Sequence, residues 1–198
     1  MLQGEHLKYK YMETATKNLE NDHVYILRLI DVMEQMVITI STELKHIELA
    51  VGLIRNYADG FHHAKEETLL FPLLVNKGFS YDQGPIPVML HEHAEGRKFV
   101  QGMTKEIENI KNGDTSSFTI LYENMQGYID LLRAHIRKEN NVLFHLADEK
   151  LSPDDQEELL KAFAAIEKTN YRPEMIDRFI TEIEGLEVIY KEGVRSKE

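Results

Sequence analysis

The chain has 198 residues, of which 42% are hydrophobic and 29% are charged, and its 34 acidic and 23 basic residues give a net charge of −11. That length suffices for one domain with a buried core, and the acidic balance disfavours nucleic acid and anionic membranes, because phosphate groups bind clustered Lys and Arg. The absence of cysteine excludes disulfides, thiol catalysis and cysteine-held iron–sulfur clusters. The composition leaves nine histidines to be explained.

Four segments carry apolar side chains at three- and four-residue spacing, which predicts four amphipathic helices. These stripes cover residues 19–37, 54–73, 86–107 and 125–146. No segment alternates between apolar and polar residues over the length of a strand. The fold class predicted from the sequence is therefore all-α, an up-down-up-down bundle of four helices.

Turn residues separate the four segments. Residues 76–85 have the composition of a loop, and Asn112-Gly113-Asp114 that of a turn, whereas the boundary near Ser41-Thr42 is marked only by hydroxyl residues. If His23 and His62 face each other across a hairpin, its turn lies midway, at residues 42–43. The same construction for a second histidine pair, His93 and His135, places its turn at residue 114.

A second unit follows the four segments. Ser152, then Pro153 and two acidic residues, form the pattern of a helix N-terminus. We predict one helix from there to about Thr169 and another over residues 174–191, neither of which contains histidine. The chain is thus divided into residues 1–151, the bundle, and 152–198, a helical extension that packs on the bundle or on a second copy of the chain in a homodimer.

Neither a membrane span nor an export signal is recognised in the sequence. There is no run of 18 or more apolar residues, the length that predicts a span. The first ten residues, MLQGEHLKYK, lack the apolar region of a secretory signal. We therefore expect a cytoplasmic protein that binds neither a membrane nor nucleic acid.

An internal repeat contains the histidines of interest. Residues 62–72, HHAKEETLLFP, align with residues 135–145, HIRKENNVLFH, and an acid-rich histidine segment precedes each of them, at 21–23 and 91–93. The chain is therefore interpreted as two helical hairpins of similar design. Each hairpin offers one histidine followed by a His-x-x-x-Glu motif.

The spacing of that motif suits metal binding. Residues four apart on a helix lie one above the other, about 6 Å apart by rise, so an imidazole and a carboxylate can bind one metal ion or the carboxylate can join two. Glu66 and Glu139 lie within apolar stripes, where a carboxylate is costly unless it is paired or bound to metal. Four histidines and two glutamates from four helices favour a pair of iron ions.

The segments HHAKEETLLFP, GPIPVMLHEHAEGR and HIRKENNVLFH together resemble the hemerythrin-like (HHE cation-binding) family over about residues 15–150. The resemblance implies a four-helix bundle that holds an oxo- or hydroxo-bridged di-iron centre. It further implies that the terminal ligands are four histidines, His23, His62, His93 and His135. The carboxylates that bridge the two irons would then be Glu66 and Glu139.

One alternative ligand pair remains open. His63 and Glu67 have the same spacing as His62 and Glu66 but stand one residue out of register with the second repeat. Glu66 and Glu139 each precede the Phe of a Leu-Phe pair by five residues, so the register favours His62 and Glu66.

The sequence departs from the oxygen-carrying hemerythrins. Those proteins have a fifth histidine four residues after the one on the third helix, where this chain has Arg97 after His93. They also have an aspartate five residues after the fourth-helix histidine, where this chain has Asn140 after His135. The set of four His and two Glu is similar to family members that resemble iron-centre repair proteins, which usually carry an additional cysteine-bearing domain that this sequence does not contain.

The resemblance implies a protein that binds or senses a small diatomic ligand, oxygen or nitric oxide. The alternatives are a di-iron enzyme acting on nitric oxide or peroxide, an iron donor in the repair of iron–sulfur centres, and divalent-metal storage or a structural zinc pair. The sequence does not decide between binding and turnover, so no catalytic residue is assigned. Gly96 is expected either to leave room for the ligand or to allow close helix packing, and Tyr128 either to hydrogen-bond the ligand or to pack as an aromatic.

Overall fold

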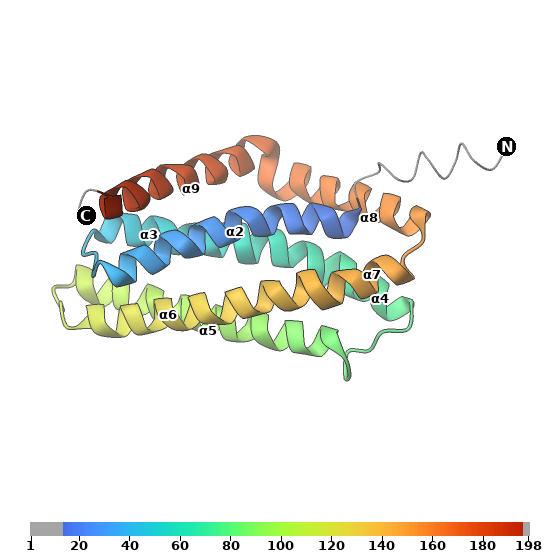
Figure 1. The fold of residues 1–198 in the computed structure, drawn as a ribbon, viewed down its shortest axis with the longest axis horizontal. Helices are drawn as coiled ribbons and strands as arrows, with labels where there is room; N and C mark the ends of the chain where they lie inside the picture. The colour runs from blue at the N-terminus through green and yellow to red at the C-terminus, as the bar shows by residue number, and fades with distance from the viewer. Residues whose placement is uncertain (1–13, 196–198) are drawn as a thin grey trace.

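The computed structural model describes residues 14–195, and every regular element in that range is helical (Figure 1). The predicted all-α fold is confirmed. Four long rods run up and down beside one another, and two of them combine α-helical with π-helical segments. The first rod is α2 (Ala15–Ile38), the second α3 (Leu44–Leu53), η1 (Ile54–His63), η2 (Glu66–Leu70) and α4 (Phe71–Asn76), the third α5 (Pro85–Lys111), and the fourth α6 (Ser117–Lys138), η3 (Glu139–Leu143) and α7 (Phe144–Lys150).

The turns between the rods lie where the sequence predicts them. Residues 39–43, 77–84 and 112–116 separate the helices. Gly113 has a φ of 97°, a left-handed conformation that glycine adopts without steric cost. The first turn has no glycine, and Ile40 takes a φ of 50° there instead. This use of a β-branched residue at positive φ explains why the first turn had the weakest signal in the sequence.

The extension begins with a capping box and then continues without a break. Ser152 Oγ accepts a hydrogen bond from the Asp155 backbone N–H at 3.2 Å, and the Asp155 carboxylate accepts one from the Ser152 N–H at 2.8 Å. The predicted interruption near residues 170–173 is instead a π-helical turn that runs directly into the following helix. The elements are α8 (Pro153–Ile166), η4 (Glu167–Tyr171) and α9 (Arg172–Arg195).

The hydrophobic core consists of two clusters stacked along the bundle. The larger cluster surrounds Met33, Phe61 and Met125, and the smaller one surrounds Phe71 and Phe144. The predicted ligands stand where the two clusters meet. The site is therefore a buried polar band between two apolar layers, which exclude water from it on both sides.

The extension contributes to both clusters. Phe179 and Ile183 of α9 are buried in the larger cluster, and Phe163 of α8 is buried in the smaller one. In Figure 1, α9 and α8 lie along the blue helix α2 as one bent arm. The division of the chain into two units at residues 151 and 152 remains a prediction. Among residues 14–195, no helix has both the length and the apolar character that are needed to cross a lipid bilayer.

The internal repeat is visible in the backbone as well. Two five-residue π-helical segments begin at Glu66 and Glu139, at the same register of the repeat. Pro72 follows the first segment and His145 occupies the equivalent position after the second, so proline is not the cause. Single π-helical turns within α-helices occur frequently at functional sites. The shared feature of these two turns is that each starts on a predicted bridging glutamate.

Candidate metal centre

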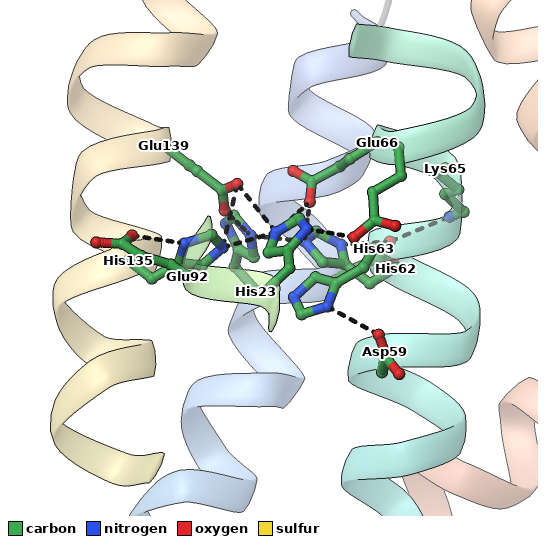
Figure 2. A network of polar contacts seen from close by, with 12 residues as sticks. His23, Asp59, His62, His63, Lys65, Glu66, Glu92, His135 and Glu139 are labelled. Carbon is green, nitrogen blue, oxygen red and sulfur yellow. Dashed lines mark hydrogen bonds and ion pairs between the residues drawn. The ribbon is translucent and has the colours of Figure 1, made fainter. Parts of the chain in front are cut away.

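The structure brings all six predicted ligands together in the polar band. Figure 2 shows five of them by label: His23, His62, Glu66, His135 and Glu139. Each of them is at most 1% exposed. Two groups of side chains have ligand atoms within 4.8 Å of one another, and both groups include Glu66. The groups are His23, His62, Glu66 and Glu139, and His63, Glu66, His93 and His135.

The ring Nε2 atoms face each other in pairs. His23 Nε2 lies 2.8 Å from His62 Nε2, and His93 Nε2 lies 3.1 Å from His135 Nε2. We call these pairs, with the side chains that contact their Nδ1 atoms, the His23/His62 half and the His93/His135 half. Two nitrogen lone pairs at such distances repel each other, so each pair requires a proton or a cation between its rings.

Both glutamates stand between the two halves. Glu139 has one carboxylate oxygen 3.2 Å from His23 Nε2 and the other 3.2 Å from His135 Nε2. Glu66 Oε2 lies 3.7 Å from His62 Nε2 and 3.5 Å from His93 Nε2. Each carboxylate therefore contacts at least one ring of each pair, which is the placement expected of a group shared by two ions.

In each half, the Nδ1 atom of one ring, its outer nitrogen, donates to an acidic residue. The position of this acid in the sequence is the same in both hairpins. Asp22, directly before His23, accepts from His62 Nδ1 at 3.3 Å. Glu92, directly before His93 in the second hairpin, accepts from His135 Nδ1 at 3.0 Å. A carboxylate on the outer nitrogen fixes the ring orientation and leaves Nε2 available to a metal.

The Nδ1 atoms of the other two rings, His23 and His93, also have acceptors at equivalent positions of the repeat. The acceptor is in each case the residue directly after a predicted bridging glutamate. Glu67 accepts from His93 Nδ1 at 2.7 Å, and Asn140 accepts from His23 Nδ1 at 2.7 Å. Glu67, which the sequence left open as a ligand, therefore contacts the back of a histidine rather than lying among the clustered ligand atoms. The acceptors were not predicted, although the acids beside His23 and His93 were visible in the repeat.

The donor set fits a cation. None of the four carboxylate oxygens of Glu66 and Glu139 has a hydrogen-bond partner within the described part of the chain, and both residues are 0% exposed. Burying an ionised carboxylate without a hydrogen bond costs roughly several kcal/mol. Imidazole nitrogens and shared carboxylates are donors that iron accepts. The centre thus has the chemistry of a metal site rather than that of a packed core.

The electrostatics of the buried side chains point the same way. Burial, and then the neighbouring Glu139, raise the pKa of Glu66 well above its usual value. Burial alone would also raise the pKa of Glu139, but the His135 and His23 rings outweigh it and hold that pKa well below its usual value. Burial opposes the charging of His135, yet Glu139 and Glu92 raise its pKa to about 9. Glu139 thus requires neighbouring positive charge to stay ionised, and a metal ion bound between these side chains would supply it.

The structure adds a fifth histidine, His63, to the centre. Its ring stacks on the His93 ring with centroids 3.8 Å apart, and its Nδ1 contacts Asp59 Oδ1 at 3.3 Å. Adjacent side chains on an α-helix diverge by about 100°, so only one of two consecutive histidines was expected to face inward. The wider turn of the π-helical segment η1 reduces that angle, and both His62 and His63 are buried.

A pocket of about 200 Å³ opens beside the His93/His135 half. Gly96 and Tyr128 both line it, and a Cβ atom at residue 96 would lie 3.5 Å from the Tyr128 ring. That distance is an ordinary van der Waals contact, so the two roles expected of Gly96 both remain predictions. The lining residues also include Ile54, Asp59, His63, His93, Arg97 and Val100.

Fold and site together define a helical bundle with a buried His/Glu site for cations. The chain matches the hemerythrin HHE cation binding domain over residues 14–147 and belongs to that family. Family membership and the buried His and Glu groups together indicate a metal site, with iron as the metal.

The curated relatives match a shorter segment. Iron-sulfur cluster repair protein YtfE of Dickeya chrysanthemi (strain Ech1591) is 35% identical over 86 residues, which are 42% of this chain and 38% of that protein. The protein of the same name from Escherichia coli O1:K1 / APEC is 35% identical over 85 residues, 42% of this chain and 39% of its own length. The match thus spans well under half of these relatives. No solved structure gives a significant match.

Proposed function

We propose that the chain holds two iron ions, one at each half of the centre, with Glu66 and Glu139 shared between them. The observation that carries this proposal is the pair of buried carboxylates without hydrogen-bond partners, each placed between the two histidine pairs. His23, His62, His93 and His135 are the terminal ligands in this proposal, as the sequence predicts. His63 is added as a third imidazole of the His93/His135 half.

Arg97 supports this addition. It stands where the oxygen carriers have their fifth histidine, and its guanidinium donates to Asp59 at 2.7 Å and to Glu67 at 2.8 Å. Those two carboxylates are the acceptors of His63 Nδ1 and His93 Nδ1. Arg97 therefore anchors two imidazoles indirectly, and a histidine from another rod takes the place of the missing one.

We further propose that the centre binds a small diatomic ligand, oxygen or nitric oxide. Iron bound in the His93/His135 half would supply an open coordination position and a change of oxidation state. The pocket beside His63 and His93 gives a small molecule a route to that half, and its walls at Val100 and Tyr128 are largely apolar. Apolar walls suit an uncharged diatomic ligand better than a charged substrate.

The test is anaerobic purification followed by metal analysis and absorption spectroscopy. We expect two irons per chain and a new absorption band when oxygen or nitric oxide is admitted. A band that disappears when the gas is removed supports reversible binding, whereas rapid conversion to an inert diferric spectrum supports redox turnover of the ligand. A chain that binds zinc, or no metal, contradicts the proposal.

A second candidate function is the supply of iron for the repair of iron–sulfur centres. It is favoured by the relatives, which are named as iron-sulfur cluster repair proteins, although the match to them covers 42% of this chain. The test is to incubate the protein, loaded with ⁵⁷Fe, with an apo-ferredoxin and sulfide in the presence of a chelator that captures free iron. Transfer of label to the ferredoxin despite the chelator supports iron donation, and transfer no faster than from a ferrous salt contradicts it.

A further inference from the structure

A lysine precedes each shared glutamate, and the two lysines have different surroundings. Lys65 forms an ion pair with Asp22, the acceptor of one ligand histidine, and Lys138 does the same with Glu92, the acceptor of another. The Lys138 side chain is 40% exposed, whereas that of Lys65 is 0% exposed. The repeat thus provides the same ion pair twice, once at the surface and once buried.

Lys65 is buried because the extension covers it. Its Nζ lies 3.1 Å from Asp22 Oδ2 and 2.9 Å from Glu167 Oε1, and Glu167 belongs to η4. It also donates to Asn18 Oδ1 at 3.1 Å and lies 3.9 Å from the centre of the Phe61 ring. A buried ammonium group is retained only where charges and hydrogen bonds compensate it, so the carboxylate of the extension is needed at this position.

A second, independent contact places the extension against the rod that carries His62. The Tyr171 ring packs edge-on against Phe61 with centroids 5.4 Å apart. The Tyr171 hydroxyl oxygen occupies space beside Gly60, where a Cβ atom would lie only 2.6 Å from it. The extension therefore fits closely onto η1 within three residues of the ligand histidine.

We propose that the extension forms part of the metal centre. Glu167 holds Lys65, Lys65 holds Asp22, and Asp22 orients the His62 ring, through contacts of 2.9, 3.1 and 3.3 Å. Lys65 and Glu167 are positioning residues for the His23/His62 half. The His93/His135 half has no such cover among the described residues: its equivalent lysine is exposed and its pocket is open. This inference rests on the proposed two-iron site.

The competing explanation is that Lys65 and Glu167 only hold the extension in place. The two explanations differ in what happens to the metal. A purely structural link changes the unfolding of the protein but affects both ions alike, whereas a positioning link loosens one ion of the two. The equivalent lysine of the other half, Lys138, provides a matched control because it makes the same kind of ion pair from a side chain that is exposed.

The experiment uses the full chain loaded with ferrous iron and compares wild type with Lys65→Met, Glu167→Gln and the control Lys138→Met. Release of each ion to a chelator is followed under anaerobic conditions, and ⁵⁷Fe Mössbauer spectra are recorded for each protein. Changes to residues that orient metal-binding histidines typically cost about 10- to 100-fold in metal affinity. We expect Lys65→Met and Glu167→Gln to release one ion about 10-fold faster and to alter one of two iron signals, and Lys138→Met to change little.

Three outcomes decide the matter. If both ions leave all four proteins at the same rates and the spectra agree, the positioning role is wrong. Faster release of both ions in step also contradicts it, because that is the effect of a loosened fold. Wild-type protein without iron contradicts the proposed function itself and removes this inference with it. If Lys65→Met does not fold, Glu167→Gln decides, since it removes one charge from a side chain that is 31% exposed.

Discussion

The two halves of the centre are built from the same repeat but differ in their surroundings. The His93/His135 half opens to a pocket, and both of its outer nitrogens donate to carboxylates, Glu67 and Glu92. The His23/His62 half lies under the extension, and the outer nitrogen of His23 donates to the neutral amide of Asn140. The repeat therefore explains how the ligands converge, and the departures from the repeat explain which half is accessible.

The largest effect is expected where the two halves share a side chain. Glu139→Gln keeps the shape of the side chain but removes the charge that both histidine pairs contact, so we expect the iron content to fall from two per chain to less than one. Metal analysis of protein purified without oxygen measures this. The control is Glu149→Gln, an exposed acid on the same rod, which should keep both irons. Two irons in Glu139→Gln would show that the carboxylate is not shared.

A second comparison separates the two consecutive histidines. His62→Ala should lose the iron of the His23/His62 half, because that half has one other imidazole. His63→Ala should keep both irons and weaken only the His93/His135 half, by about 10-fold, since two imidazoles remain there. Metal analysis with chelator competition distinguishes the two variants. The reverse order of effects would mean that His63 is the ligand of the first half and that the register of the repeat misled the assignment.

This pair of histidines marks the limit of what the sequence predicted. The four rods, their turns and the convergence of the six side chains follow from helical periodicity and from the repeat, which depend on local spacing. The inward position of His63 depends on the π-helical turn of η1, and nothing in the local sequence distinguishes that turn from an α-helix. The acceptors Asp22 and Glu92 were recognised as acids near histidines, but their partners lie on another rod, so the pairing required the fold.

Lys65 shows a different limit. In the sequence it is equivalent to Lys138, and both stand directly before a shared glutamate. Lys65 is buried because the extension docks over it, whereas Lys138 stays exposed. The two helices of the extension contain no histidine, cysteine or marked turn, so no sequence motif indicates which surface they dock on. The predicted extension therefore gave no indication of its contact with the centre.

A smaller change should make the two halves more alike. Asn140→Asp gives His23 a carboxylate acceptor, as His93 already has, and a carboxylate increases the basicity of the ring it holds. More basic ligands favour ferric over ferrous iron, so we expect the reduction potential of one iron to fall, by about 59 mV for a tenfold change in relative affinity. A spectroelectrochemical titration measures it. Glu67→Gln is the opposite change in the other half and should raise the potential there. An unchanged potential in both variants would show that these acceptors only orient the rings.

The smallest effect concerns the start of the extension, at the smaller core cluster. Lys77, and then Ser152, lower the pKa of Asp155 from 3.8 to about 2. Because the pKa in the folded state is below the usual value, the contribution of Asp155 to stability is complete above pH 3.8 and is lost as the pH falls towards 2. At neutral pH, Asp155→Asn should lower the Tm by about 2 °C, because the side chain caps an exposed helix end and pairs at the surface. This difference from wild type should shrink as the pH is lowered from 4 to 2, which thermal melts followed by circular dichroism can measure. A difference that stays constant over that range would mean that the Asp155 charge contributes nothing to holding the extension on the bundle.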